Sequence, residues 1–432
     1  MRLPGRLAAA IEVLADMDRR KRPASEALKG WALDHRFAGA GDRAAIGNLV
    51  YDALRRRASH AWRMGEDTPR ALVLSVAVND WGEDVAALNQ SFKDDKFAPE
   101  SISEAEAASL SNDSAFSHAP AAVRADIPDW LESSLERGFG ADWIAEGQGM
   151  TTRPPLDMRV NTLKAHREKV AKSLARFSPQ PTAIAPEGLR IAAGPRDART
   201  ANVQADEAYQ KGWFEIQDEG SQIVSLLTGA APGEQVLDLC AGAGGKTLAM
   251  AAAMGNTGQI FAYDAERTRL APIFERLKRA GVRNVQTRNP EAGALDDLVE
   301  KMDRVVVDAP CTGTGTWRRR PDTKWKLTPE QLQARIAEQI VVLNDAARFV
   351  RPGGMLVYIT CSILPEENDD QAKAFLARHP DFAGVPAMPV FEQVFPDAKA
   401  RPFSADGATL TLTPARTDTD GFFCALFTRT AI

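Results

Sequence analysis

Two cysteines occupy positions where a thiol could act as a nucleophile. Cys311 follows the apolar run 305–307, and Cys361 follows the apolar run 355–359. Each run has the length and composition of a buried strand, so each cysteine is expected in an open loop just beyond a strand end. A cysteine thiolate attacks electrophilic carbon readily. Two thiols placed in this parallel manner therefore indicate covalent chemistry.

The other two cysteines, Cys240 and Cys424, have no comparable relation to each other. An isolated cysteine is usually a small buried hydrophobic residue, and we interpret both thiols in this way. The four cysteines show no C-x-x-C spacing and are accompanied by only five histidines. A structural zinc site is therefore not expected, and neither is any other metal.

A glycine-rich turn in residues 236–247, VLDLCAGAGGKT, has the pattern of a ligand-binding loop between a strand and a helix. Glycines let the backbone approach a ligand closely, and the free amides at a helix start attract negatively charged groups. The predicted cofactor-binding residues of this turn are Cys240, Ala241, Gly242, Ala243, Gly244, Gly245 and Lys246.

Several ligands compete for a turn of this shape. A P-loop requires G-x-x-x-x-G-K-T, and Cys240 occupies its first glycine position, although Gly245, Lys246 and Thr247 fit. The dinucleotide fingerprint G-x-G-x-x-G fails because Thr247 stands in place of its third glycine. A purely structural strand-to-helix turn is a further alternative.

Two polar residues beyond the turn could complete a nucleoside site. Asp264 ends the next apolar strand, about 20 residues after the turn, where a carboxylate can accept hydrogen bonds from both hydroxyls of a ribose. It favours a nucleoside over a bare triphosphate, with a solvated aspartate as the alternative. Asn289, after the strand-like residues 285–287, could contact an adenine edge or serve as a turn residue before Pro290.

A cationic segment with two tryptophans, WRRRPDTKWK, follows Cys311 at residues 317–326. Cations bind phosphates and aromatic rings stack on bases, so this segment is predicted to bind RNA. An ordinary solvated surface is the alternative. The predicted RNA-binding residues are Trp317, Arg318, Arg319, Arg320 and Lys324.

A common framework must position these residues, and from about residue 220 the sequence provides one. Apolar strand-like runs alternate with helical stretches, which predicts an α/β fold with a mostly parallel, doubly wound sheet. Ligands bind such sheets at the carboxyl ends of the strands, where the motifs lie. The run 305–307 followed by Asp308 could also be the magnesium-binding strand of an NTPase.

The first half of the chain has a different character. Apolar residues recur at helical spacing near its start, which predicts an all-helical domain over residues 1–140 with an acidic connector near 91–120. Residues 141–216 shift to proline-punctuated, strand-like sequence and are predicted to form a small α+β, RNA-recognition-like segment. Residues 217–432 form the predicted ligand-binding domain.

Composition and charge limit the class of protein. With 432 residues, 44% hydrophobic and 26% charged, the chain has the profile of a multidomain globular protein. Its net charge of −5 argues against a chain that is basic throughout, although residues 1–70 carry 14 Lys or Arg against 9 Asp or Glu and could face a polyanion. No apolar run approaches the roughly 18 residues that span a bilayer, so a cytoplasmic protein is expected.

Together the motifs resemble those of the Nop/Sun family of RNA cytosine-5 methyltransferases. The N-terminal helical block, with RLAAAIEVL and DRAAIGNLVYDALRRR, also resembles the NusB-like RNA-binding domain of the bacterial ribosomal RNA members. The main resemblance spans residues 153–429 and rests on QDEGSQ (217–222), the glycine turn, DAPCTGTG (308–315), TCSILPEEN (360–368) and TDTDGFF (417–423).

This resemblance implies a Rossmann-like class I methyltransferase domain. Such an enzyme transfers a methyl group from S-adenosylmethionine to carbon 5 of a cytosine in RNA, here small-subunit ribosomal RNA. It implies that Cys361 adds to carbon 6 of the base and that Cys311 assists release. Asp308 would then lie between the methyl donor and the base and hydrogen-bond the cytosine amino group, while Lys246 would help to activate a thiol.

Two positions depart from the family pattern. Family members usually read CAAPGGK where this chain has CAGAGGK at residues 240–246, which keeps the small residues and loses the proline. The adenine contact is usually an aspartate, where this chain offers Asn289. A P-loop-type NTPase acting on RNA and a catalytically silent RNA-binding scaffold are the alternative functions.

Overall fold

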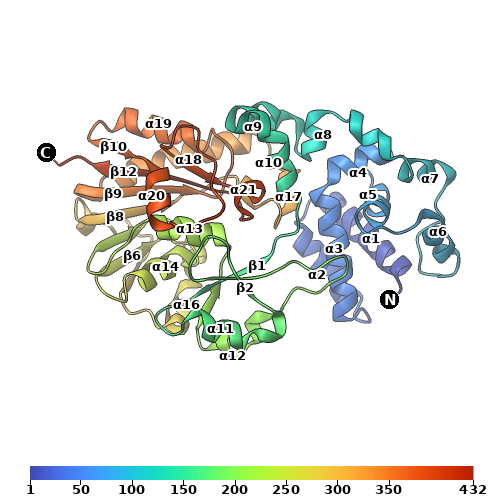
Figure 1. Ribbon diagram of the computed structural model, residues 1–432, viewed down its shortest axis with the longest axis horizontal. Coiled ribbons are helices and arrows are strands. Elements are labelled where there is room, and N and C mark those ends of the chain that lie inside the picture. Colours follow the sequence, from blue (N-terminus) through green and yellow to red (C-terminus); the bar gives the residue numbers. More distant parts are fainter. Residues whose placement is uncertain (432) are drawn as a thin grey trace. The chain divides into compact units, whose positions relative to one another are not determined.

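The chain divides into two compact units that each contain segments far apart in the sequence (Figure 1). The computed structural model describes residues 1–431, except for the side chains of residues 113–115. The first unit comprises Met1–Pro154, Ala193–Thr200 and Trp317–Lys326, and the second comprises Pro155–Ala192, Ala201–Thr316 and Leu327–Ile432.

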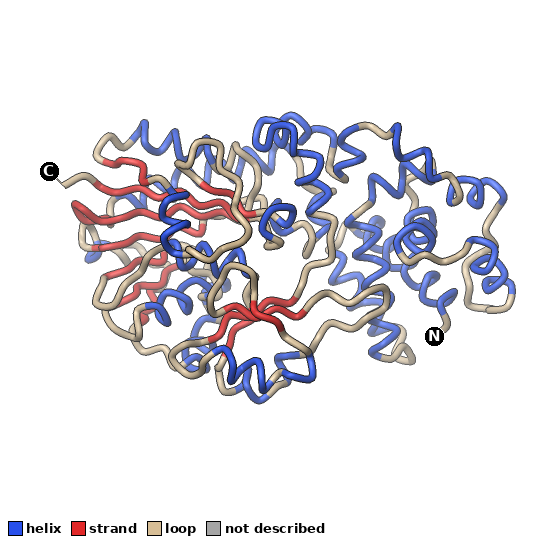
Figure 2. Tube along the Cα trace, viewed as in Figure 1, coloured by secondary structure: helices blue, strands red, loops and turns tan. Residues whose placement is uncertain are grey.

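The first unit is helical, as the sequence predicts (Figure 2). Leu7 and Leu14 of α1 lie on one helix face and are at most 1% exposed, and they pack in a common core with Ile46 and Leu49 of α3. Its helices are α1 (Leu3–Arg20), α2 (Ala24–Asp34), α3 (Ala40–Arg55), α4 (Arg57–Met64), α5 (Pro69–Ser75), η1 (Val76–Asp80), α6 (Val85–Lys93), α7 (Glu104–Leu110), η2 (Asp113–His118), α8 (Ala121–Ala125), η3 (Asp129–Leu131), α9 (Glu132–Phe139), η4 (Gly140–Asp142), α10 (Trp143–Gly149) and α17 (Pro321–Lys324).

The second unit is built on an eight-stranded sheet of order β10-β12-β9-β8-β5-β6-β7, with β11 paired to β12. The pairs from β9 to β7 along this order are parallel, whereas β12 runs antiparallel to β9, β10 and β11. The predicted mostly parallel sheet is confirmed. Its strands are β5 (Gln235–Asp238), β6 (Gln259–Tyr263), β7 (Val285–Arg288), β8 (Met302–Asp308), β9 (Val350–Thr360), β10 (Phe382–Val385), β11 (Leu410–Leu412) and β12 (Phe422–Arg429).

Helices cover both faces of this sheet, because neighbouring strand residues point to opposite sides. Val236 of β5 packs in a core with α13, α14 and α20, and Leu237 packs in a second core with α18 and α19. The helices that accompany this sheet are α13 (Glu219–Leu227), α14 (Gly245–Ala253), α15 (Arg267–Leu270), α16 (Ile273–Ala280), η7 (Asp296–Leu298), η8 (Thr314–Thr316), α18 (Pro329–Ala347), α19 (Asp369–Arg378), α20 (Ala387–Val394) and α21 (Pro414–Thr417).

A smaller antiparallel sheet of order β2-β3-β1-β4 belongs to the same compact unit. Met158 of β1 and Phe214 of β4 are fully buried in its core, against Val170 of α11. Its elements are β1 (Leu156–Val160), α11 (Arg167–Ser173), η5 (Ala175–Phe177), β2 (Gln180–Pro181), β3 (Gly188–Ile191), η6 (Val203–Ala205), α12 (Glu207–Gln210) and β4 (Phe214–Ile216). The segment predicted over residues 141–216 is thus shared between the two units.

None of the described helices has the length and apolar character needed to cross a membrane.

Candidate active site

The carboxyl ends of β8 and β9 bring two thiols together. These strands are parallel neighbours, so the loops that follow them leave the sheet at the same edge. The Sγ atoms of Cys311 and Cys361 lie 3.4 Å apart, within hydrogen-bonding distance for two sulfurs. Both thiols therefore belong to one site.

Backbone contacts fix the two thiol loops to each other. The Gly315 amide donates a hydrogen bond to the Cys361 carbonyl at 2.9 Å. The hydroxyls of Thr314 and Ser362 lie 3.0 Å apart. A Cβ on Gly315 would lie 2.2 Å from the carbonyl oxygen of Gly421, so no larger residue fits there. The loops consequently have one well-defined arrangement.

A buried carboxylate anchors the loop of Cys311. Glu367 accepts hydrogen bonds from the Thr312 amide at 2.8 Å and from the Thr312 hydroxyl at 2.5 Å. Gln339 of α18 donates to the same carboxylate at 3.0 Å and to the Pro310 carbonyl at 2.9 Å. Burial raises the pKa of Glu367, and these donors partly offset that effect. The residues on both sides of Cys311 are therefore held in place.

The next residue, Asn368, holds the loop of Cys361. Its side-chain amide donates to the Ser362 carbonyl at 2.9 Å, and its Oδ1 accepts from the Thr360 hydroxyl at 2.6 Å. The sequence analysis assigned no role to Glu367 or Asn368. Their signal was present in TCSILPEEN, where two polar residues follow the second thiol closely.

An ion pair lies beside the thiols. Lys246 Nζ is 2.6 Å from Asp308 Oδ2, and the Lys246 side chain is only 9% exposed. Burial lowers the pKa of Lys246, but the charges of Asp308 and Cys361 outweigh burial, so the pKa is raised overall. Lys246 therefore remains a cation at the carboxyl ends of the strands.

The environment of Cys311 favours its protonated form. The hydrogen bond to Cys361, together with burial, raises the pKa of Cys311 well above its ordinary range. Cys311 therefore keeps its proton and can donate it to the neighbouring sulfur. The Cys311 thiol is therefore the protonated member of the pair.

The glycine turn forms a backbone cradle between β5 and α14. Gly242 (φ 49°) and Gly244 (φ 81°) adopt left-handed conformations that favour glycine. A Cβ on Gly244 would lie 2.4 Å from Cγ1 of Ile273, so the turn also needs the missing side chain. Arg276 of α16 donates to the Ala243 carbonyl at 2.7 Å and fixes the turn from outside.

Asp264 is joined to this cradle. The Gly242 amide donates to its Oδ2 at 3.0 Å, and the Glu266 amide donates to its Oδ1 at 2.9 Å. The side chain is 3% exposed, so it is not the solvated aspartate of the alternative interpretation. Each carboxylate oxygen can accept a further hydrogen bond, for example from a ribose hydroxyl.

Asp238, which ends β5, is a buried carboxyl that the sequence analysis did not single out. Its Oδ2 accepts from the Thr247 hydroxyl at 2.6 Å, whereas its Oδ1 has no hydrogen-bond partner among the described residues. Burial raises the pKa of Asp238 to about 7. The lone oxygen is an acceptor that a ligand amine or amide could satisfy.

Asn289 lies at the same edge of the sheet, just beyond β7. Its side chain is exposed, and its carbonyl accepts from the Glu291 amide at 2.9 Å. No hydrogen bond joins Asn289 to the glycine turn or to Asp264 within the described part of the chain. Its contact with an adenine stays a prediction.

The cationic segment Trp317–Lys326 corrects one expectation. Trp317, Arg318 and Lys324 are 1%, 0% and 1% exposed, and the segment belongs to the first unit. These three side chains are buried in the structure and are therefore not exposed for RNA binding as the sequence predicts. Arg319 is partly exposed and Arg320 is exposed, so they remain at the surface.

The burial of these cations has a simple physical cause. Helix α3 ends at Arg55, and its last carbonyls have no partner within the helix. Lys324 Nζ donates to the Arg55 carbonyl at 2.8 Å, and Trp325 Nε1 donates to the Leu54 carbonyl at 2.6 Å. Arg55 in turn donates to the Arg318 carbonyl at 2.8 Å. The segment therefore caps α3.

The remaining two cysteines have unreactive surroundings. Burial raises the pKa of Cys240 far above its ordinary range and that of Cys424 to about 12. No group of three or more His, Cys, Asp or Glu side chains in the described part of the chain is arranged to hold a metal ion.

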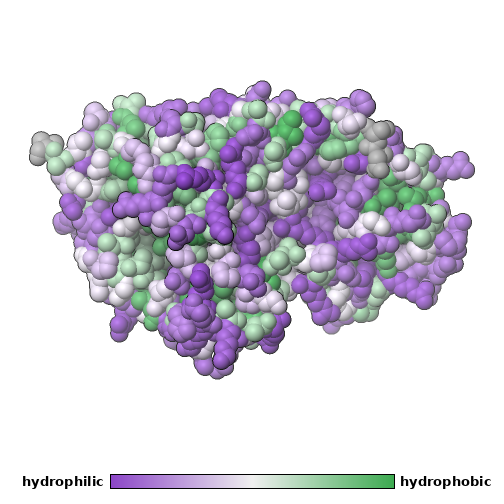
Figure 3. Space-filling view, in the orientation of Figure 1, coloured by the Kyte–Doolittle hydropathy of each residue, from purple (hydrophilic) through white to green (hydrophobic). Residues whose placement is uncertain are grey.

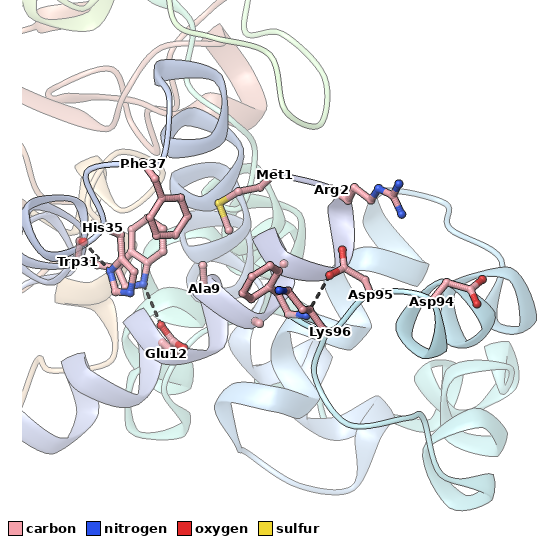
Figure 4. A pocket seen from close by; sticks show the side chains of 13 residues that line it. Met1, Arg2, Ala9, Glu12, Trp31, His35, Phe37, Asp94, Asp95 and Lys96 are labelled. Atoms are coloured by element: carbon pink, nitrogen blue, oxygen red, sulfur yellow. Dashed lines mark hydrogen bonds between the residues drawn. The ribbon is translucent and has the colours of Figure 1, made fainter.

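A cavity of about 760 Å³ lies in the first unit and is distinct from the thiol site (Figure 4). The stacked rings of Trp31 and His35, with centroids 4.3 Å apart, form one wall, and Phe37 and Phe97 also line it. None of the residues that the sequence assigns to a cofactor or to catalysis borders this cavity.

Two regions of the chain match domains of one known family. Residues 226–428 match the family described as "16S rRNA methyltransferase RsmB/F", and residues 127–196 match "Methyltr_RsmF/B-like, ferredoxin-like domain". These matches support the predicted methyltransferase and not the NTPase alternative. The NusB-like character of the N-terminal helices stays a prediction.

Two curated relatives are similar over most of the chain. The Synechocystis sp. protein named "Probable ribosomal RNA small subunit methyltransferase B" is 34% identical over 307 residues, which are 69% of this chain and 66% of that protein. "Ribosomal RNA small subunit methyltransferase B" of Citrobacter koseri is 34% identical over 269 residues, 61% of each chain. The matched part is thus just under two thirds of the length of each relative.

Solved structures share the architecture. The crystal structure of PH0851 is 26% identical, with a TM-score of 0.73 over 99% of both chains. NSun6 from Pyrococcus horikoshii with SFG is 21% identical, with a TM-score of 0.61 over 71% of this chain and 99% of that one, and it supports the fold alone. The chain therefore contains, in this order, two regions that match domains of the RsmB/F methyltransferase family.

Proposed function

We propose that the protein methylates carbon 5 of a cytosine in RNA, with S-adenosylmethionine as methyl donor. The observation that carries this proposal is the pair Cys311 and Cys361 at 3.4 Å, beside the Lys246–Asp308 ion pair at the strand ends. Small-subunit ribosomal RNA is the proposed substrate, because the relatives are named for that activity. We place this reaction in the cytoplasm. The helical unit is proposed to assist in binding the RNA.

The cradle fits the methyl donor. Gly242 and Gly244 leave room for a nucleoside, Asp264 offers its carboxylate to the ribose hydroxyls, and Asp238 Oδ1 is a buried acceptor without a partner among the described residues. Residues 240–246, Asp264 and, as a further proposal, Asn289 would hold the cofactor. When bound, S-adenosylmethionine supplies an electrophilic methyl group.

The thiols supply the chemistry that cytosine lacks. Carbon 5 of cytosine is a poor nucleophile, and addition of the Cys361 thiolate to carbon 6 makes carbon 5 enamine-like. Lys246 stabilises the thiolate before attack. Asp308, paired with Lys246 and 33% exposed, is placed to accept a hydrogen bond from the cytosine amino group.

The second half of the reaction restores the aromatic base. Once the methyl group is on carbon 5, the proton on that carbon passes to a water molecule, the C–H electron pair forms the double bond between carbons 5 and 6, and the Cys361 sulfur leaves carbon 6 with the electrons of the C–S bond. Cys311, which keeps its proton next to that sulfur, is placed to assist the departure of the thiolate. The site therefore divides attack and release between two residues.

Transfer of labelled methyl from S-adenosylmethionine to protein-free small-subunit ribosomal RNA tests the proposal. Digestion to nucleosides should show label in 5-methylcytidine, and Cys361→Ala should abolish it while S-adenosylmethionine still binds. Cys424→Ala, which removes a thiol of the core, is the matched control and should retain transfer. Label in another nucleoside, or transfer by Cys361→Ala, would contradict the assignment.

A further inference from the structure

A cationic surface on the second unit lies outside the thiol site, and of its elements α16 also contacts the cradle, through Ile273 and Arg276. It is formed by α11 with the residues before it, by α12 with the following turn, and by α16 with its end, at residues 161–176, 206–213 and 273–283 (Figure 1). These segments contain ten Lys or Arg and four Asp or Glu, a net charge of +6 in a chain whose total is −5. Figure 3 shows mainly hydrophilic side chains where Figure 1 places α11 and α12.

Direct contacts join the segments into one surface. Lys164 Nζ donates to the carbonyls of Lys211 at 3.1 Å and Arg279 at 2.6 Å. A Cβ on Gly212 would lie 2.0 Å from the Arg279 carbonyl oxygen, so the turn at residue 212 lies directly against the end of α16. The cations of the three segments are therefore neighbours in space and not only in composition.

Trp213 holds two of these cations in place. Lys169 Nζ lies 3.9 Å and Lys211 Nζ lies 5.2 Å from the centroid of its ring. A cation–π contact restrains an ammonium group without neutralising its charge. Lys211 also pairs with Glu207 at 2.7 Å, whereas Lys169 has no carboxylate partner among the described residues.

Other cations of the surface also lack counter-ions. Lys172, Lys278 and Arg283 are exposed, and none of them forms an ion pair within the described part of the chain. By contrast, Arg276 and Arg279 share the single carboxylate of Glu215, at 3.1 and 2.5 Å. Exposed cations that gather on one side repel each other, and a bound polyanion relieves that repulsion.

We infer that this cationic surface of α11, α12 and α16 binds the phosphate backbone of the RNA outside the thiol site. The inference rests on the proposed function, which makes RNA the polyanion that the protein must hold. Phosphate contacts position a nucleic acid without reading its bases, and they make binding strongly dependent on salt. The surface would hold the RNA while the thiol site selects the cytosine.

A pair of charge reversals tests the inference. Lys172→Glu with Lys278→Glu changes two exposed lysines that touch neither Trp213 nor the cradle. Lys373→Glu with Lys399→Glu is the matched control, because it changes the net charge equally at exposed lysines of the second unit that lie outside this surface. Binding of a labelled small-subunit ribosomal RNA fragment is measured across a salt series.

The surface variant should bind roughly ten-fold more weakly, with a salt slope lower by about 2, and the control should match the wild type. Equal behaviour of the two double variants would overturn the inference. Wild-type methyl transfer separates the two proposals. If the wild type transfers methyl groups but both variants bind alike, only the surface is wrong. If the variants differ but no methyl group is transferred, the surface stands and the proposed function fails.

Discussion

The thiols of Cys311 and Cys361 lie in contact, but the residues around them differ. Cys311 keeps its proton because a second sulfur and the protein interior both disfavour its thiolate. Cys361 is one of the groups whose charge raises the pKa of the buried Lys246. The proposed order of events, attack by Cys361 and release with the help of Cys311, uses this difference in surroundings.

Loss of the proton donor should trap the reaction after methyl transfer. Cys311→Ala is expected to accumulate a covalent protein–RNA adduct, because Cys361 can still attack but its release is slowed. A denaturing gel with labelled RNA measures the adduct, and Cys311→Ala with Cys361→Ala should remove it. Absence of adduct in the single variant would count against this division of roles.

The buried carboxyl of Asp238 should make stability depend on pH. Its pKa of about 7 in the folded protein lies above the ordinary value of 3.8, so the folded state retains a proton that the unfolded state releases. The free energy of unfolding should therefore decrease as the pH rises from 4 to 7, and Asp238 should contribute a few kcal/mol of that decrease.

Asp238→Asn cannot titrate and should lack this part of the dependence. Urea unfolding of both proteins at pH 5 and pH 8 measures the effect. Identical pH dependence in the wild type and the variant would show that Asp238 ionises without cost, contrary to its burial.

At the level of single elements, the turn between β5 and α14 depends on close approach. Gly244 combines a left-handed backbone with contact to Ile273 of α16, so the turn and that helix fix each other. Arg276 reinforces this contact through the Ala243 carbonyl. The shape of the cradle is therefore set by α16 as well as by its own glycines.

Gly244→Ala should weaken S-adenosylmethionine binding by at least about ten-fold, because the new methyl group must displace Ile273 at the cost of overpacking, about 1–3 kcal/mol. Gly255→Ala is the matched control, since Gly255 also has a positive φ of 60° but nothing lies within 4 Å of its added Cβ. Calorimetric titration of both variants separates the clash from backbone strain. Equal affinities of the two variants for S-adenosylmethionine would show that Ile273 moves aside at no cost to binding.

The strands that position the site could be predicted from the sequence, but the side-chain hydrogen bonds that hold its loops could not. Apolar runs ending in Asp308 and before Cys361 were sufficient to place both at one edge of a parallel sheet. Glu367 and Gln339 could not be predicted, because their role depends on side-chain contacts between α18 and two loops. The burial of Lys324 was also missed, since it depends on carbonyls at the end of a helix some 270 residues away in sequence.

At the level of the whole molecule, the helical unit is completed by a segment from the second half of the sequence. The chain enters the first unit at Trp317, only six residues after Cys311, and leaves it at Lys326. The tryptophan and two cations of this segment are buried instead of reaching solvent. Integrity of the helical unit thus depends on residues that directly follow a reactive loop.

Trp317→Ala should destabilise the first unit by about 3–5 kcal/mol, the usual cost of truncating a large buried aromatic residue. Phe37→Ala, at a ring that is 73% exposed, is the control and should have little effect. Amide hydrogen exchange resolved by peptide should show faster exchange in α3 for the first variant alone. Unchanged protection of α3 would contradict the capping role of the segment.

The capping of α3 also sets the order in which the protein can mature on the ribosome. The helices of the first unit emerge early, but the carbonyls of Leu54 and Arg55 receive their partners only when Lys324 and Trp325 have left the exit tunnel. The nascent helical unit must therefore wait, incomplete, through the synthesis of most of the catalytic unit. A gene fragment that stops after residue 154 would encode this unfinished state, so dissection of the protein should use internal substitutions in place of truncation.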